Sequence, residues 1–321
     1  MFGNNSWLVY ALITTLLWGL AELFYKKGAR ADEKYAHLKI SICVGLVMGL
    51  HAIYTLLTKD IDYKFIYLVK YLPVSMLYIL SMTFSFFGMR FVEESISDPI
   101  ENTSGAMCSL LCVIFLKEAL SIPAVIAIII MAIGMLGVGF LENKGDTLRK
   151  KVLGKKMAIV AFCMPFVYAI LDAVGSFADV FYLDDIDTTP LKGVTEKTIE
   201  DVANTSYELT FAFFALVLFI FMVIKKVKFG SVLKQKDKFL SAIFETGGQL
   251  TYVYAMSGGN GAKSAPIISA VCVVSLLLSR IFLKEKLTAK KYLFIGIVIF
   301  GILMLAIEEE LGVMTLLGFL K

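Results

Sequence analysis

Four carboxylates and one guanidinium lie within long apolar stretches of this 321-residue sequence, at Glu22, Glu101, Asp172, Glu245 and Arg280. An ionisable side chain inside a bilayer is costly, so it normally faces a cavity or a charged partner. Four acids against one base leave an excess of negative charge, which suits a cationic solute, a coupling proton, or both in turn. We therefore expect the acids to line a substrate or proton site, with Arg280 as charge partner of one of them.

The segment around Glu245 carries a polar stripe where lipid would favour apolar residues. Glu245, Gln249 and Tyr252 are spaced i, i+4 and i+7, which places them on one face of a helix. Apolar residues flank this stripe on both sides along the chain. The pattern predicts that the three side chains line a cavity, and all three belong to the predicted site.

Two of the acids follow an aromatic residue by about one helical turn. Trp18 stands four residues before Glu22, and Tyr168 stands four residues before Asp172. An aromatic ring beside a carboxylate can hold an ammonium group through cation–π attraction combined with charge. The two pairs therefore predict a binding site for an amine, and none of these residues is expected to be catalytic.

Each acid also has a simpler interpretation. Glu22 could pair across one turn with Lys26 at the membrane interface. Glu101 could belong to an acidic loop, and Asp172 could begin the acidic run that continues through Asp179. The aromatic residues, taken singly, also suit helix packing. The sequence leaves these alternatives open.

The composition limits the class of protein. Hydrophobic residues make up 58% of the chain and charged residues 18%, which is typical of an integral membrane protein. The net charge of +4 suits loops that face anionic lipid. The sequence has no basic patch of the kind that binds nucleic acid. The five cysteines lie in apolar runs without a CxxC pair, so we expect neither disulfides nor zinc. With two histidines and no HExxH or GxSxG motif, we expect no enzyme and no cofactor.

Ten stretches are long enough to cross a bilayer as helices, because about 20 apolar residues span its core. They are apolar on all faces instead of alternating as the strands of a membrane barrel do. The predicted fold is therefore all-α integral membrane with ten transmembrane helices. The stretches are 6–27, 38–58, 66–89, 96–117, 121–141, 156–177, 206–225, 239–257, 265–283 and 290–307.

The two halves of the chain repeat. A shift of 167 residues places the run IFLKE at 114 on IFLKE at 281, Pro99 on Pro266, and Gly134 on Gly301. Because each repeat holds an odd number of spans, the second enters the membrane from the opposite face. Inverted repeats with a site between the halves are characteristic of alternating-access transporters.

The predicted organisation follows from these repeats. A basic connecting loop separates two five-helix repeats, and an acidic loop of about 179–206 interrupts the second. The units are 1–142 for the first repeat, 143–155 for the basic loop, 156–307 for the second repeat, and 308–321 for a short tail.

The repeated motif resembles a known family. FLxExLS at Phe115–Ser121 and FLxExLT at Phe282–Thr288, each between the fourth and fifth span of its half, are similar to the drug/metabolite transporter superfamily, EamA-like branch. The resemblance implies export or exchange of amines, amino acids, nucleotides, sugars or drugs, often driven by protons. The pair Ala21-Glu22 is similar to an Ala-Glu pair in the small multidrug-resistance branch, where the acid alternates between proton and substrate. The acidic loop departs from the family pattern.

Orientation remains open. Most lysines and arginines fall in the loops after the odd-numbered spans, which places those loops in the cytoplasm and both ends outside. The resemblance implies cytoplasmic ends instead. We expect a multi-pass protein of the plasma (inner) membrane.

The functional expectation combines these observations. We expect a secondary active transporter, exporter or exchanger, of a small cationic or zwitterionic metabolite such as an amine or amino acid, with a proton as candidate coupling ion. The alternatives are a sugar or nucleotide carrier of the same fold, or a channel or membrane scaffold. The expected partners are a small-molecule substrate and the lipid bilayer, and the oligomeric state is not predicted.

Overall fold

The structure is a computed structural model, and it describes residues 6–29, 33–88, 100–142, 155–184, 190–195, 197–282 and 287–311. Within these ranges the chain is helical apart from turns and one isolated bridge between Lys192 and Val194. The all-α prediction is therefore confirmed for the described residues.

The helices and helical turns of the described residues follow the apolar stretches closely. They are α1 (Ser6–Gly28), α2 (Ala36–Thr58), α3 (Phe65–Gly88), α5 (Thr103–Leu111) continued by the π-helical turn η1 (Cys112–Leu116), α6 (Ile122–Glu142), α7 (Lys155–Asp184), α8 (Ile199–Ile224), the short 3-10 turn η3 (Val232–Gln235), α9 (Lys236–Met256), α10 (Gly261–Ser269), α11 (Val271–Phe282) and α12 (Ala289–Leu311).

Seven helical segments among the described residues are long and apolar enough to cross a membrane. Two shorter apolar segments, Thr103–Leu116 and Ile122–Gly137, accompany them. The helix α9 carries the polar stripe of the predicted site and is less apolar than the others. The protein is therefore a multi-pass helical membrane protein.

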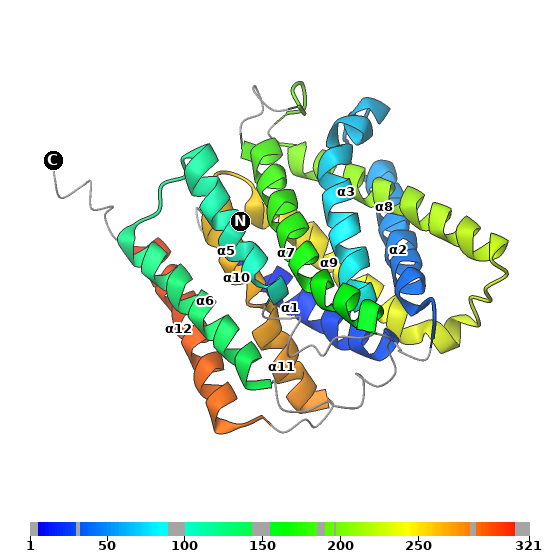
Figure 1. Ribbon diagram of the computed structural model, residues 1–321. Helices are drawn as coiled ribbons and strands as arrows, with labels where there is room; N and C mark the ends of the chain where they lie inside the picture. The colour runs from blue at the N-terminus through cyan, green and yellow to red at the C-terminus, as the bar shows by residue number, and fades with distance from the viewer. Residues whose placement is uncertain are drawn as a thin grey trace.

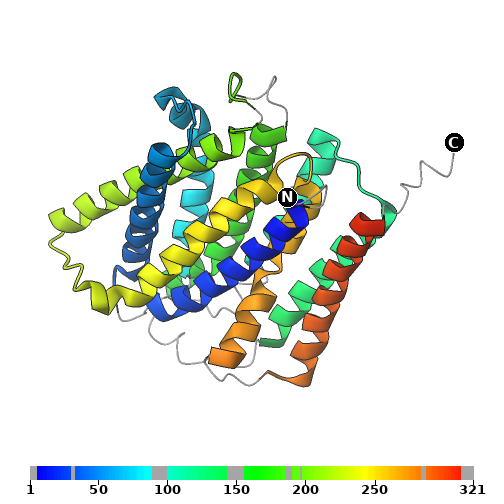
Figure 2. The same cartoon turned by 180° about the vertical axis from the view of Figure 1, so that it is seen from behind.

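The bundle has two ends, which we name after the first and last residues of α1. At the Ser6 end, Tyr10 of α1 stacks on Tyr254 of α9 with ring centroids 5.2 Å apart. At the Gly28 end, Phe24 of α1 stacks on Phe244 of α9 at 5.7 Å. The helix α1 thus runs antiparallel to α9 along its whole length (Figure 2).

Helices from the two halves of the chain pack in pairs. The main pairs are α1 with α9, α3 with α7, α2 with α8, α5 with α10, and α6 with α12. The pair α6 and α12 lies along one edge of the bundle, and α1, α3, α7 and α9 lie further inside (Figure 1). Every main pair joins one half to the other, so the centre of the bundle is lined by both.

Glycines allow the edge pair to approach closely. A Cβ at Gly134 of α6 would lie 2.6 Å from a methyl carbon of Val298 in α12. A Cβ at Gly301 of α12 would lie 2.4 Å from Met131 of α6. The aligned glycines of the two repeats therefore play matching parts in one contact, as small residues do between membrane helices.

One span is interrupted near the centre, where α10 ends at Ser269 and α11 begins at Val271. Pro266 within α10 has no N–H for the carbonyl of Ala262, and the hydroxyl of Ser109 in α5 donates to that carbonyl instead, at 2.8 Å. The backbone N–H of Ala262 donates to Glu118 at 2.9 Å, so this motif glutamate caps the start of α10. The half-helix of one repeat is thus held by residues of the other.

The acidic connection is shorter than predicted. The helix α7 continues to Asp184 and α8 begins at Ile199, so the predicted loop of about 179–206 is wrong at both edges. Apolar residues between the acids allow both helices to extend, so that Asp179 and Asp184 lie on α7, and Glu200 and Asp201 lie on α8. Pro99, the basic loop at 143–154, Glu285 and the tail beyond 311 lie outside the described residues.

Candidate functional site

Two adjoining pockets occupy the centre of the bundle, between α1, α3, α5, α7, α9 and the α10–α11 junction. We name them the Tyr252 pocket, with a volume of about 60 Å³, and the Glu245 pocket, with a volume of about 90 Å³. They share one wall, to which both repeats contribute. The residues of that wall are Trp18, Glu22, Tyr78, Glu101, Tyr168, Asp172 and Val271.

The structure brings all eight predicted binding residues to these pockets. Five of them belong to the shared wall, Tyr252 lines the Tyr252 pocket, and Glu245 and Gln249 line the Glu245 pocket. Their sequence separation spans more than two hundred residues, so only the pairing of the halves gathers them. Whether they bind substrate stays a prediction.

Glu245 is the most enclosed acid of the Glu245 pocket. Its side chain is 7% exposed, and its Oε2 accepts a hydrogen bond from the hydroxyl of Tyr25 at 3.2 Å. The ring of Tyr25 in turn packs against Phe86, with centroids 4.6 Å apart. The carboxylate is therefore held by one neutral donor and keeps acceptor capacity for a ligand.

Trp18 is fixed between α1 and the polar stripe of α9. Its ring stacks on Tyr252 with centroids 5.1 Å apart, and its Nε1 donates to the backbone oxygen of Glu245 at 3.3 Å. A Cβ at Gly248 would lie 2.3 Å from its Cδ1, so the indole lies directly against the α9 backbone. The absence of a side chain at Gly248 therefore allows Trp18 to stack on Tyr252 in this position.

Gly248→Ala is expected to displace the Trp18 indole and so lower transport and solute affinity several-fold, because the added methyl would overlap the ring. Gly247→Ala is the matched control, since a Cβ there would lie an ordinary 3.4 Å from Leu17. Equal transport rates for the two variants in proteoliposomes would show that the indole position is unimportant.

Glu101, two residues before the start of α5, and Asp172 of α7 face the pockets. The hydroxyl of Ser85 donates to Oε2 of Glu101 at 2.8 Å, and Glu101 is only 8% exposed. The hydroxyls of Ser104 and Tyr168 lie close to the Asp172 carboxyl. Neither acid belongs to an exposed loop, and hydroxyl groups again supply the neighbouring donors.

The charge of the pockets is one-sided. Glu22, Glu101, Asp172 and Glu245 line them, whereas no lysine, arginine or histidine is among the described residues that do so. Arg280 lies exposed in the last turn of α11 and lines neither pocket, so its role as charge partner stays a prediction. A cation entering the pockets would meet several carboxylates and aromatic rings.

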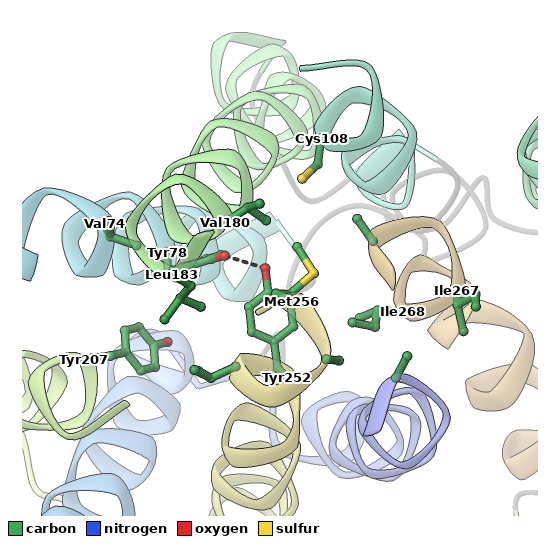
Figure 3. Close-up of a cluster of buried hydrophobic side chains, with 14 of the residues drawn as sticks. Val74, Tyr78, Cys108, Val180, Leu183, Tyr207, Tyr252, Met256, Ile267 and Ile268 are labelled. Carbon is green, nitrogen blue, oxygen red and sulfur yellow. Dashed lines mark hydrogen bonds between the residues drawn. The ribbon is translucent and has the colours of Figure 1, made fainter. Parts of the chain in front are cut away.

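The pockets end at an apolar seal towards the Ser6 end. The hydroxyls of Tyr78 and Tyr252 lie 2.6 Å apart and form a hydrogen bond across the pocket wall. Apolar side chains lie around this pair, as Figure 3 shows, and they include Val74, Val180, Leu183 and Met256. Among the described residues, these apolar side chains therefore lie between the tyrosine pair and the Ser6 end.

Sequence reasoning missed several polar groups near the centre. Tyr25 and Tyr78 line pockets, although Tyr25 lies three residues after Glu22 on the same helical face and could have been found. Glu208 is fully buried in α8, and both its oxygens lie within 2.9 Å of Nδ1 of His51. The predicted span began at 206, and the sequence analysis did not single out Glu208, which lies close to that start. This pair lies between α2 and α8, outside both pockets.

Comparisons with known proteins agree with this architecture. The model of the EamA-like transporter family matches residues 189–307. A crystal structure whose title names no function resembles the chain with a TM-score of 0.69 at 12% identity, over 94% of this chain and 96% of that chain. At that identity the likeness shows the fold alone. No curated protein matches the chain.

Proposed function

The chain belongs to the drug/metabolite transporter superfamily, in its EamA-like branch, and on that premise we propose that it is a secondary active transporter of a small cationic or zwitterionic amine. Membership makes it a multi-pass membrane transporter. The substrate and the mechanism are the part that we propose, and the negative charge of the two pockets is the observation that carries it.

The packing of the helices supports two inverted five-helix repeats. We equate α1 with α7, α2 with α8, α3 with α9, α5 with α10 and α11, and α6 with α12. Exchanging equivalent helices leaves the set of pairs between the long helices unchanged, because α1 with α9 becomes α7 with α3, and the pairs α2 with α8 and α6 with α12 map onto themselves. This is the pattern that a two-fold axis between the halves would produce, and it favours alternating access to a site on that axis.

The chemistry of the pockets favours an amine over the alternatives. The phosphates of a nucleotide would need cationic partners, and the described lining offers carboxylates instead. Ammonium groups gain from both the carboxylates and the faces of Trp18 and the tyrosines. About 10–15 Å³ of cavity holds one water, so the pockets suit a small solute or its charged group. The tyrosine-bonded seal favours a carrier over an open channel.

The described lysines at the Gly28 end support the charge-based orientation. That end carries Lys26 and Lys27 at the close of α1, and Lys225 and Lys226 follow α8. By the positive-inside rule we propose that the Gly28 end faces the cytoplasm. The pockets would then be sealed from the outside in this conformation.

A binding screen on the purified protein tests the proposed substrate class. Aliphatic amines and diamines, each compared with the alcohol of the same length, are expected to raise the melting temperature, because ligand that binds only the folded state stabilises it. Amino acids, sugars and nucleosides complete the panel. If the alcohols or the sugars stabilise the protein as much as the amines do, the negative charge of the pockets does not select the substrate.

A further inference from the structure

Another buried acid, besides Glu208, lies within a helix and outside the pockets. Asp179 stands on α7 seven residues beyond Asp172, towards the Ser6 end, and its side chain is fully buried. The sequence alone assigned it to the acidic run after the sixth span. The structure instead places it inside the bundle, next to α3.

The surroundings of Asp179 are neutral. The Tyr71 hydroxyl donates a hydrogen bond to Oδ1, and Oδ2 has no hydrogen-bond partner among the described residues. The titratable groups that face it are tyrosines from three neighbouring helices, and the one other acid nearby on its own helix is Asp172. The tyrosines are Tyr71 and Tyr78 of α3, Tyr207 of α8 and Tyr252 of α9.

An acid in this position needs a cation or a proton. A carboxylate buried among apolar and neutral polar groups is costly, and the cost disappears when a proton neutralises it. Among the described residues, the side chains that interact with the Asp179 carboxyl are the hydroxyls of Tyr71 and Tyr78, and no lysine, arginine or histidine does so. An intramembrane acid with no charged partner is by default a candidate for a functional role.

The pocket wall limits what can reach Asp179. Tyr78 and Tyr252 line the Tyr252 pocket on one side, and the Tyr78 hydroxyl lies near Asp179 on the other. Their mutual hydrogen bond of 2.6 Å closes the gap between them, and Val180 and Leu183 fill the surroundings (Figure 3). A solute cannot pass this barrier in the present conformation, but a proton can pass from hydroxyl to hydroxyl.

We propose that Asp179 binds the proton that couples transport, and that Tyr252 and Tyr78 relay this proton between the pockets and the Asp179 carboxylate. A water in the pocket gives a proton to the Tyr252 hydroxyl, which passes its own to Tyr78, and Tyr78 passes its own to Oδ2. Each tyrosine gains one proton and loses one, the carboxylate becomes a carboxylic acid, and the water leaves as hydroxide. The inference rests on the proposed function, since it supplies the driving ion for that transport.

Two measurements on proteoliposomes that contain the full chain distinguish proton coupling from transport itself, namely uphill movement driven by a pH gradient and counterflow without a gradient. With an imposed gradient of about one pH unit, one proton per solute supports about tenfold uphill movement of a transported amine. Asp179→Asn mimics the permanently protonated acid, so we expect it to keep amine counterflow while losing pH-driven uphill movement. If Asp179→Asn still concentrates the amine as the wild type does, or if a sodium gradient drives the wild type instead, Asp179 is not the coupling group.

A second pair of variants covers the case in which Asp179→Asn does not fold. Tyr71→Phe removes the donor to the carboxylate, which favours the protonated acid, so the pH profile of transport is expected to shift to higher pH. Tyr182→Phe is the matched control, because the Tyr182 hydroxyl donates to the backbone oxygen of Lys70 and not to Asp179. Identical pH profiles for the two variants would overturn the inference. Absence of amine counterflow in the wild type would instead refute the proposed function itself.

Discussion

Glu245→Gln is expected to lower the transport of a cationic solute about 10- to 100-fold, because a charge-assisted contact contributes roughly 1.5–3 kcal/mol. Glutamine is nearly isosteric and can still accept the hydrogen bond from Tyr25, so the helix contact between α1 and α9 is kept. The change therefore removes the charge and little else. Counterflow of an amine in proteoliposomes measures the effect.

Glu245→Asp completes this test because it keeps the charge and shortens the side chain by one methylene group. We expect it to retain much more transport than the glutamine variant does. Should both variants transport amines at the wild-type rate, Glu245 has no part in solute binding. If the aspartate variant loses transport while the glutamine variant keeps it, the length of the side chain matters and its charge does not.

Glu33→Gln is expected to lower the melting temperature by about 5 °C or more, because the Glu33 carboxylate forms ion pairs with two buried lysines at the Gly28 end. Lys39 of α2 and Lys238 of α9 are 6% and 3% exposed, and both donate to the Glu33 carboxylate, Lys238 at 3.0 Å. Without that carboxylate two ammonium groups lose their anionic partner. The contact joins the loop after α1 to helices of both repeats.

The loss is expected to depend on pH. Burial raises the pKa of Glu33, but the hydrogen bonds from Lys39 and Lys238 outweigh it and hold the pKa below its ordinary value of 4.5. A lowered pKa in the folded state gives stability that is fully present above pH 4.5 and is lost as the pH falls through the folded value. Melting curves of the wild type and the variant should therefore converge in acid and differ near neutral pH.

Asp62→Asn serves as the control for this measurement. Asp62 pairs with Lys64 at 3.0 Å, but its side chain is 84% exposed, and an ion pair in water contributes little. Its melting temperature should match that of the wild type at every pH. A Glu33→Gln variant as stable as Asp62→Asn near neutral pH would show that the lysines find other partners.

The features that the sequence predicted well depend only on residues within a single helix. Within the part of the chain that the structure describes, each apolar stretch is helical, because hydrophobic length is a local property. The stripe of Glu245, Gln249 and Tyr252 needs only helical spacing, and the structure places it in the pockets. The glutamate of the first repeated motif, Glu118, follows the fourth predicted span, and in the structure it caps α10.

The features that the sequence could not show depend on contacts between distant segments. The Tyr78–Tyr252 hydrogen bond joins residues 174 positions apart, and no spacing rule predicts it. Asp179 was assigned to a loop because acids follow it, whereas the apolar residues around it keep α7 helical to Asp184. Tertiary packing decided both cases. The residues that seal the pockets therefore emerged only from the fold.

Counterflow of a radiolabelled amine in proteoliposomes, with no pH or ion gradient, tests most directly whether the acid-lined pockets carry a cationic solute from one side to the other. The account predicts saturable uptake that depends on unlabelled amine inside the vesicles, is inhibited by other amines, and is not inhibited by alcohols of the same length. Uptake that does not saturate, that needs no internal amine, or that sugars and alcohols inhibit equally well would contradict it.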